Sequence, residues 1–217
     1  MSDAMINLLL SAFWETLLMT FGSGLLACLF GIPLGVALHV SKPGQIWQHA
    51  SLNWLLGAIV NIGRSIPFII LLVAIIPFTR FIVGSSIGTL AAVVPLTVAA
   101  IPFVARLMEG ALMEVPAGLT EAAQAMGATR MQIISKVLLP EALPSMLNGV
   151  IITLVTLVNY SAMAGVVGGG GLGDVGIRYG YQRFDLTVML LVILILVVLV
   201  QLIQSAGDRL VAYVDHR

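Results

Sequence analysis

Long apolar stretches alternate with short polar segments along this chain. About 20 predominantly apolar residues are enough to cross the hydrocarbon core of a bilayer as a helix. By that measure the pattern predicts five membrane-spanning helices, at about residues 14–40, 52–78, 89–107, 147–167 and 186–204. We therefore expect an all-α polytopic membrane protein in which residues 1–217 form a single transmembrane domain.

The first predicted span, residues 14–40, is longer than a bilayer core requires. We expect it to be tilted or kinked, with the kink at Pro33. Gly31 and Gly35 form a G-x-x-x-G pair within it. Small residues at this spacing allow two helix backbones to approach closely. The pair therefore predicts tight packing against a neighbouring helix rather than a ligand site.

Asn61 and Arg64 interrupt the second predicted span, and the apolar run that follows, residues 67–78, is short for a span by itself. At the middle of a membrane Arg64 would cost several kcal/mol unless it were paired or hydrated, which would make it a functional residue. At the membrane surface it would only anchor the helix. Both interpretations are open from the sequence.

The fourth predicted span is the most polar, and its polar or thioether side chains lie roughly on one helical face: Asn148, Thr156, Asn159 and Met163. A single polar residue in a span usually bonds to a neighbouring helix. Several of them gathered toward one end favour a translocation pathway instead. The candidate pathway residues are Arg64, Asn159, Tyr160, Ser161 and Met163.

Composition agrees with a membrane protein, because 59% of the residues are hydrophobic and only 9% are charged, whereas about 25% are charged in a typical soluble domain. Ten basic and ten acidic residues balance, so no net charge favours nucleic acid as a partner. The single cysteine, Cys28, cannot form an internal disulfide. The N-terminus lacks the basic start and cleavage site of a signal peptide, so we expect the first span to be retained.

The longest polar segment between spans, about residues 109–141, has clear signals for where helices begin and end. Pro116 suits the first turn of a helix, and Gly127 suits the left-handed position just past a helix end. A helix of about ten residues fits between them. It carries one apolar stripe, formed by Leu119, Ala122, Ala123 and Met126.

A second helix is predicted to begin directly after Gly127. Thr129 and Gln132 have the T-x-x-Q spacing of a capping box. We expect this helix to stop before Pro140, because a proline disfavours helical backbone in the residue before it. The segment would then consist of two short helices joined by a glycine turn.

The first of these helices could lie on the lipid surface or dock a partner protein. A surface anchor usually carries large apolar side chains opposite several Lys or Arg residues. This helix has no basic residue, and half of its apolar stripe is alanine. Small alanines would let another protein surface approach closely, so the composition favours a partner.

Within the same segment, Glu121-Ala122-Ala123, Gly127, Leu139-Pro140 and Pro144 closely resemble the EAA loop of permease subunits of bacterial ABC importers. The resemblance covers about residues 13–204 and implies a type I ABC importer permease fold. It also implies that residues 109–141 form a cytoplasmic coupling loop whose helix seats on an ATPase subunit. The implied coupling residues are Leu119, Glu121, Ala122, Ala123, Met126, Gly127 and Pro140.

Residues 64–88 and 160–181 look closest to the permease subunit of bacterial methionine importers. This narrower resemblance implies an amino-acid substrate, most specifically methionine, and a homodimer of permease subunits in membrane lipid. It also implies two cytoplasmic ATPase subunits, which bind ATP and Mg, and an extracytoplasmic substrate-binding lipoprotein. The chain itself would be a non-catalytic subunit without a cofactor or metal.

The distribution of basic residues predicts the orientation in the inner membrane. One set of alternate loops holds Lys42, Arg106, Arg130, Lys136, Arg209 and Arg217, and the other holds Arg80, Arg178 and Arg183. The loops richer in Lys and Arg are usually cytoplasmic. The N-terminus should therefore be outside, and the coupling loop and the C-terminus should be cytoplasmic.

Catalytic signatures are missing from the sequence, which contains no H-E-x-x-H, G-x-S-x-G or Walker A pattern. Gly168, Gly170 and Gly173 formally match G-x-G-x-x-G, but membrane spans flank them, so we expect a flexible connection rather than a dinucleotide site.

The alternatives to a methionine permease are a permease for another amino acid or small organic solute, and a membrane scaffold without an ATPase partner. An intramembrane enzyme would have to be assembled from Arg64, Tyr160 and Ser161.

Overall fold

The computed structural model describes residues 3–215, and no strand occurs among them. The helices are α1 (Asp3–Val40), α2 (Ala50–Ser65), α3 (Phe68–Ala74), α4 (Ile76–Val83), α5 (Thr89–Met113), α6 (Ala117–Ala125), α7 (Arg130–Ile133), η1 (Ile134–Leu138), α8 (Leu139–Val166), α9 (Gly171–Val175), η2 (Gly176–Tyr181) and α10 (Leu186–Val214). Arg217, which contributed to the basic-residue count, lies outside the described residues.

Four helical segments of the described chain are long and apolar enough to cross a membrane: Asp3–Val40, Thr89–Met113, Arg130–Val166 and Leu186–Val214. A fifth crossing would be the pair α2 and α3, which is bent by 99°. The predicted all-α architecture with about five spans is confirmed. The first span begins at Asp3 rather than near residue 14, and the fourth helix begins well before residue 147.

The bend in the second span lies between Ser65 and Phe68. Ile66 ends α2 with extended backbone (φ −85°, ψ 122°), and Pro67 follows it. A residue before proline is driven out of the helical region, because the proline ring clashes with its backbone. The second span is therefore broken where the sequence runs from Arg64 to Pro67, and is not one straight helix over residues 52–78.

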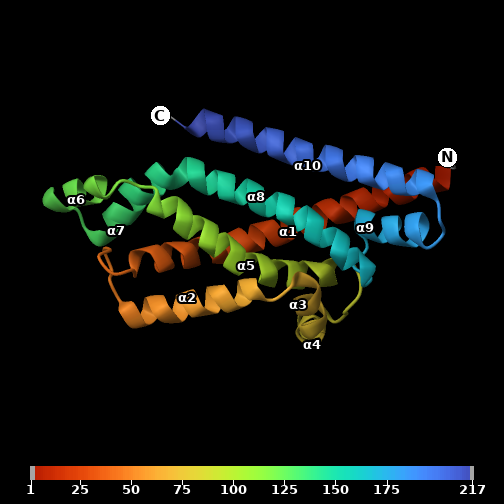
Figure 1. Ribbon diagram of the computed structural model, residues 1–217, viewed down its shortest axis with the longest axis horizontal. Helices are drawn as coiled ribbons and strands as arrows, with labels where there is room; N and C mark the ends of the chain where they lie inside the picture. The colour runs from red at the N-terminus through yellow and green to blue at the C-terminus, as the bar shows by residue number, and fades with distance from the viewer. Residues whose placement is uncertain (1–2, 216–217) are drawn as a thin grey trace.

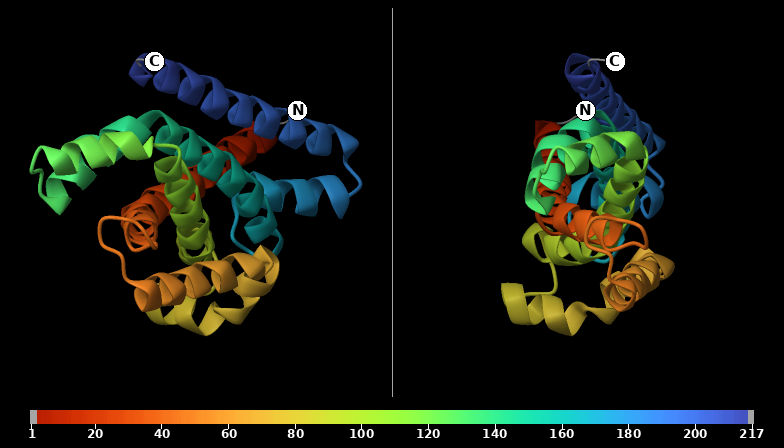
Figure 2. Two further views of the ribbon diagram at one scale, coloured as in Figure 1. Left: turned by 60° about the vertical axis from the view of Figure 1, so that its left-hand side comes forward. Right: turned by 90° about the vertical axis from the view of Figure 1, so that its left-hand side faces the viewer.

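The central layer consists of α1, α5 and α8, with α10 on one side and α2 to α4 on the other (Figures 1 and 2). A Cβ atom added to Gly31 would lie 2.7 Å from Val104 Cβ, and one added to Gly35 would lie 2.6 Å from the Ala105 carbonyl oxygen. The predicted close packing at the G-x-x-x-G pair is thus confirmed, and its partner is α5. Val104 and Ala105 are fully buried at this contact.

The ends of the described chain lie at opposite ends of the long axis, as an odd number of crossings requires (Figure 1). The helix α6 lies at the same end as the C-terminal end of α10, and α9 lies at the other. This alternation between the two ends is the one that five spans predict.

One expectation for the polar segment is wrong, because the helix that starts at Arg130 does not stop before Pro140. The segments α7, η1 and α8 form one continuous helical run, from Arg130 to Val166. Its middle, Ile134–Leu138, is π-helical, and the Leu139 N–H donates to the Ile134 carbonyl. A wider turn with i→i+5 bonds relieves the clash of a proline ring with the preceding turn, so Pro140 is accommodated at the start of α8.

The glycine-rich segment at residues 168–173, which leads from α8 into α9 and includes the start of α9, is closely packed and not the predicted flexible connection. A Cβ atom on Gly173 would lie 2.4 Å from Ala162 Cα. Gly171, with φ +78°, donates its N–H to Glu15 Oε2 at 2.7 Å, and the Leu172 N–H donates to Thr16 Oγ1 at 2.9 Å. These glycines allow backbone to approach backbone and hold the start of α9 against α1.

Candidate coupling and transport site

The helix α6, which lies in the predicted coupling loop, ends in a Schellman motif. Gly127 takes the left-handed conformation at φ +81°. Its N–H donates to the Gln124 carbonyl at 2.9 Å, and the Ala128 N–H donates to the Ala123 carbonyl at 3.1 Å. The predicted stop at Gly127 is confirmed. At the other end Pro116 immediately precedes the helix, which begins at Ala117.

The start of α7 is fixed by the predicted capping box. Thr129 Oγ1 accepts from the Gln132 N–H at 3.3 Å, and Gln132 Oε1 accepts from the Thr129 N–H at 2.8 Å. Both bonds satisfy donors that would otherwise be unpaired at the start of a helix. The local sequence therefore sets the turn between α6 and α7.

The apolar stripe of α6 is mostly uncovered. Ala123 is buried against the rest of the chain, whereas Leu119 is 42% exposed and Met126 is 82% exposed. Glu121 and Ala122 are also exposed. Large apolar side chains that stand together on an exposed surface mark an interaction site. The exposed face of α6 thus has the form expected of a docking surface, although Pro140, at the start of α8, is not part of this helix.

A buried ion-pair cluster, which was not predicted from the sequence, lies where the predicted coupling loop leaves α5. Glu109, near the end of α5, is 2% exposed. Its Oε1 lies 2.7 Å from Lys42 Nζ and its Oε2 lies 2.6 Å from Arg106 Nη1. Arg106 also bonds to Asn61 Oδ1 on α2. A buried carboxylate is tolerated only when it is paired in this way, so the cluster fixes α5 to α2 and to the segment after α1.

A second polar contact joins the two ends of the loop. Glu114, directly after α5, accepts a hydrogen bond from the Ser145 hydroxyl on α8 at 2.5 Å. A cavity of about 620 Å³ lies between these helix ends and α6, with His39, Lys42 and Glu121 among its lining residues. The pair Arg106 and Glu109, three residues apart in an apolar helix, was the sequence signal for the cluster. Nothing in the sequence pointed to Lys42 as their partner.

The candidate pathway residues divide into two groups. Asn159 and Met163 lie on an exposed stripe of α8 that also contains Ile152 and Val166. Ser161 is buried and donates to the Val158 carbonyl at 2.7 Å. Tyr160 is half-buried and stacks on Phe68 of α3, with ring centroids 4.6 Å apart. The structure therefore leaves Asn159 and Met163 on an exposed face, stacks Tyr160 on α3, and bonds the buried Ser161 hydroxyl to the backbone of its own helix.

Arg64 is exposed in the last turn of α2, immediately before the bend. No ion pair involving it occurs in the described part of the chain. Its position at a break in a span is compatible with either the anchoring or the pathway interpretation. Among residues 3–215 no group of three or more His, Cys, Asp or Glu side chains could hold a metal ion.

The opposite end of the molecule carries a polar cavity of about 430 Å³, whose lining includes Glu15, Asp174 and Arg178. Arg178 forms a hydrogen bond and an ion pair with Asp174. The hydrogen bond and the negative charge of Asp174 raise the pKa of the Arg178 guanidinium above its usual value. The arginine is therefore charged at any physiological pH.

Taken together, apolar spans around a central helix layer and an exposed helix–turn–helix loop define a membrane-embedded transport subunit. The family model described as the inner membrane component of binding-protein-dependent transport systems matches residues 30–217. The chain belongs to this family, and it is an inner-membrane permease component.

Similar proteins cover almost the whole chain. The probable D-methionine transport system permease protein MetI of Vibrio cholerae is 64% identical over 211 residues, which are 97% of this chain and 94% of that protein. The D-methionine transport system permease protein MetI of Escherichia coli K12 is 59% identical over 217 residues, the full length of both chains.

Two solved structures show the same fold. A chain of the MetNI methionine ABC transporter in an inward-facing conformation is 60% identical and has a TM-score of 0.98, with all of both chains covered. A chain of an amino acid ABC transporter is 19% identical, with a TM-score of 0.70 over 97% of this chain and 94% of that one. The second similarity shows the fold alone.

Proposed function

We propose that this chain is the permease subunit of an ATP-driven importer that moves methionine across the inner membrane. The observation that carries the proposal is the identity of 59–64%, over 97% or more of this chain, to permeases named for D-methionine transport. The second candidate is import of another amino acid or small organic solute by the same fold. It stays the alternative because a fold, here shared with a distant amino acid transporter, does not by itself specify the substrate.

The proposed assembly contains two copies of this chain, two cytoplasmic ATPase subunits that hold ATP and Mg, and a substrate-binding lipoprotein outside. The exposed stripe of α8 supports contact between two copies, since Asn159 and Met163 are polar or adaptable side chains left uncovered beside Ile152. In this assembly the N-terminus is outside, and α6 and the C-terminus are cytoplasmic. The basic-residue count supports that orientation.

In the proposed mechanism, ATP-driven closure of the two ATPase subunits moves the two α6 helices together. Each α6 is joined through residues 114–116 to α5 and through Gly127 to the continuous α7–η1–α8 helix. A displacement of α6 is therefore transmitted directly to two central spans, α5 and α8. The cluster around Glu109 passes the movement of α5 to α2 and to the end of α1. Nucleotide thereby biases a two-state equilibrium between inward-facing and outward-facing pathways.

The proposed pathway lies between the two copies, with Asn159 and Met163 on its surface. Tyr160 and Ser161 support that face from behind, and Arg64 stands at the break between α2 and α3. Methionine is a zwitterion without a side-chain charge, so a pathway for it needs no charged ring. The chain hydrolyses nothing itself, because the ATPase is a separate subunit.

Uptake of labelled methionine at low external concentration tests the proposal, in cells that lack this chain and every other methionine route. The natural chain should restore uptake, and Gly127→Val, at equal membrane abundance, should not. If the natural chain restores uptake of a different amino acid but not of methionine, the second candidate replaces the first. Equal uptake with both chains would contradict the coupling role of the loop.

A further inference from the structure

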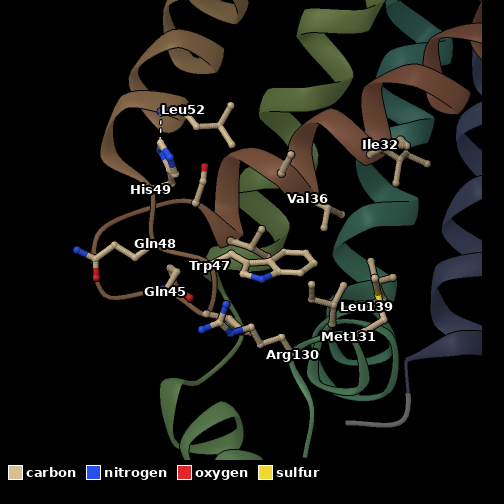
Figure 3. Close-up of a pocket in the computed structure, with 16 residues that line it drawn as sticks. Ile32, Val36, Gln45, Trp47, Gln48, His49, Leu52, Arg130, Met131 and Leu139 are labelled. Atoms are coloured by element: carbon tan, nitrogen blue, oxygen red, sulfur yellow. Dashed lines mark hydrogen bonds between the residues drawn. The ribbon is translucent and has the colours of Figure 1, made fainter.

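A groove of about 900 Å³ opens between the end of α1, residues 41–49, the start of α2 and the helical run that begins with α7 (Figure 3). Such a volume suits a ligand larger than an amino acid. The groove lies outside the exposed stripe of α8 and outside α6. Neither the proposed pathway nor the proposed ATPase contact uses it.

The two sides of the groove differ in polarity. Apolar side chains form one side, including Ile32, Val36 and Leu139, and polar side chains form the other, including Gln45, Gln48, His49 and Arg130 (Figure 3). The indole of Trp47 lies between the two sides. An apolar floor with a polar rim matches a molecule that has a hydrocarbon part and a polar head.

The polar rim is basic. Arg130 is exposed and forms no ion pair within residues 3–215, and no Asp or Glu lines the groove. His49 Nδ1 accepts from the Leu52 N–H at 3.2 Å, which assigns the proton of a neutral imidazole to Nε2. Nε2 can then donate to an anion. The head that fits this rim is therefore negatively charged.

The groove is also placed at the depth where lipid heads lie. It is bounded by the end of α1 at Val40, the start of α2 at Ala50 and the start of α8 at Leu139. All three helix ends lie at the end of the molecule that carries α6 (Figure 1). In the proposed orientation this end is cytoplasmic. Trp47 then stands at the membrane surface, where tryptophan is enriched.

We propose that this groove binds an anionic phospholipid of the cytoplasmic leaflet. An acyl chain lies along Ile32, Val36 and Leu139, and the phosphate is held by Arg130. Basic pockets between helices on the cytoplasmic side of a membrane protein are typical sites for anionic lipid heads. The inference rests on the orientation given under the proposed function. A soluble ATPase segment fits less well, because the floor is built from the last turns of a membrane span.

Photo-crosslinking of lipid to the complete transporter tests the site. The transporter is placed in nanodiscs of phosphatidylethanolamine with a small fraction of phosphatidylglycerol that carries a photoactivatable acyl chain. The label should appear in residues 32–40 or 134–139. Arg130→Gln should reduce this labelling about five-fold. The matched control is Lys136→Gln, which removes an exposed charge from the same helical run but not from the groove, and it should leave labelling unchanged.

An independent variant is Val36→Trp, whose larger side chain fills the apolar floor of the groove. This variant should also prevent the labelling. Equal labelling of Arg130→Gln and Lys136→Gln would overturn the proposal, as would labelling that appears only when the ATPase subunits are removed. If groove residues of one copy can be crosslinked to groove residues of the other, the groove is a contact between two copies of the chain and not a lipid site. An impermeant thiol reagent added outside whole cells would contradict the orientation if it reacted with a Gln48→Cys variant more than with the natural chain, whose single cysteine is Cys28. The first three outcomes leave methionine uptake, and hence the proposed function, untouched.

Discussion

Glu109 Oε1 lies 2.7 Å from Lys42 Nζ, although Lys42 follows α1 and Glu109 lies near the end of α5, far away in the sequence. Glu109 is almost fully buried, and the Lys42 side chain is 28% exposed. The contact fixes the segment after α1 to the last turns of α5, directly before the predicted coupling loop. The contact is therefore placed to fix the position of the loop relative to the spans.

Glu109→Gln should lower the stability of the transporter. The substitution removes the charge that pairs with Lys42 and Arg106, and hydrogen bonds to charged groups contribute about 1.5–3 kcal/mol. The measurement is the midpoint of thermal unfolding of the purified transporter. If the pair acts as a unit, Lys42→Gln combined with Glu109→Gln should cost less than the sum of the single variants. Strictly additive losses would show that the two side chains do not interact.

Gly127→Ala should impair methionine uptake without lowering the abundance of the chain. At φ +81° an added Cβ meets no neighbour within 4 Å, so the cost is backbone strain and not a clash. That strain is about 1–2 kcal/mol for an L-residue. Gly118→Ala is the matched control, because Gly118 lies within α6 and an added Cβ there also meets nothing within 4 Å.

Gly127→Asn should retain more uptake than Gly127→Ala, since asparagine visits the left-handed region more readily than alanine. Equal uptake by all three variants would mean that the turn after α6 does not depend on its left-handed residue.

Met126→Ser should weaken binding of the ATPase subunits and leave the fold of the permease intact. The side chain is 82% exposed, so little packing within the chain is lost. An apolar side chain that becomes buried in an interface can contribute about 2 kcal/mol to binding. Co-purification of the ATPase subunits measures the effect. Tyr213→Ser removes a side chain that is also 82% exposed, outside the loop, and should have no effect. Equal losses from both variants would argue against α6 as the docking helix.

Gly173→Ala should destabilise the fold at the end of the molecule opposite α6. The new Cβ would lie 2.4 Å from both the Cα and the carbonyl oxygen of Ala162, which are backbone atoms that cannot rotate away. Forcing an extra methyl into a packed site costs about 1–3 kcal/mol. Thermal unfolding should therefore begin earlier than in the natural chain.

The control for this substitution is Gly57→Ala, in helix α2, where an added Cβ meets nothing within 4 Å. That change should be neutral or slightly stabilising, because alanine loses less backbone freedom on folding. Unaltered unfolding of Gly173→Ala would show that the connection between α8 and α9 is loose, as the sequence alone had predicted.

Features that depend on neighbouring residues could be predicted from the sequence. The spans follow from the length of their apolar runs. The end of α6 at Gly127 and the capping box at Thr129 follow from a few adjacent residues and the hydrogen bonds they make. The apolar stripe that contains Leu119 and Met126 was also readable, because helical periodicity is a local property.

Features that depend on the surroundings were missed or wrong. The helix continues through Pro140 because a π-helical turn accommodates the proline ring. No short sequence pattern predicts the position of that turn. The sequence of the glycines from residue 168 to 173 suggests a flexible segment. In the folded chain these glycines are packed, because α1 and α8 lie against them.

The sequence by itself therefore determined that this chain crosses a membrane and carries a capped helix–turn–helix loop, since hydropathy, capping and backbone preference act within a few residues. Only the tertiary structure decided that Lys42 pairs with Glu109, that the face with Asn159 and Met163 is left exposed, and that Arg130 stands beside an apolar groove. These features depend on how helices from distant parts of the chain pack together, which no local pattern specifies.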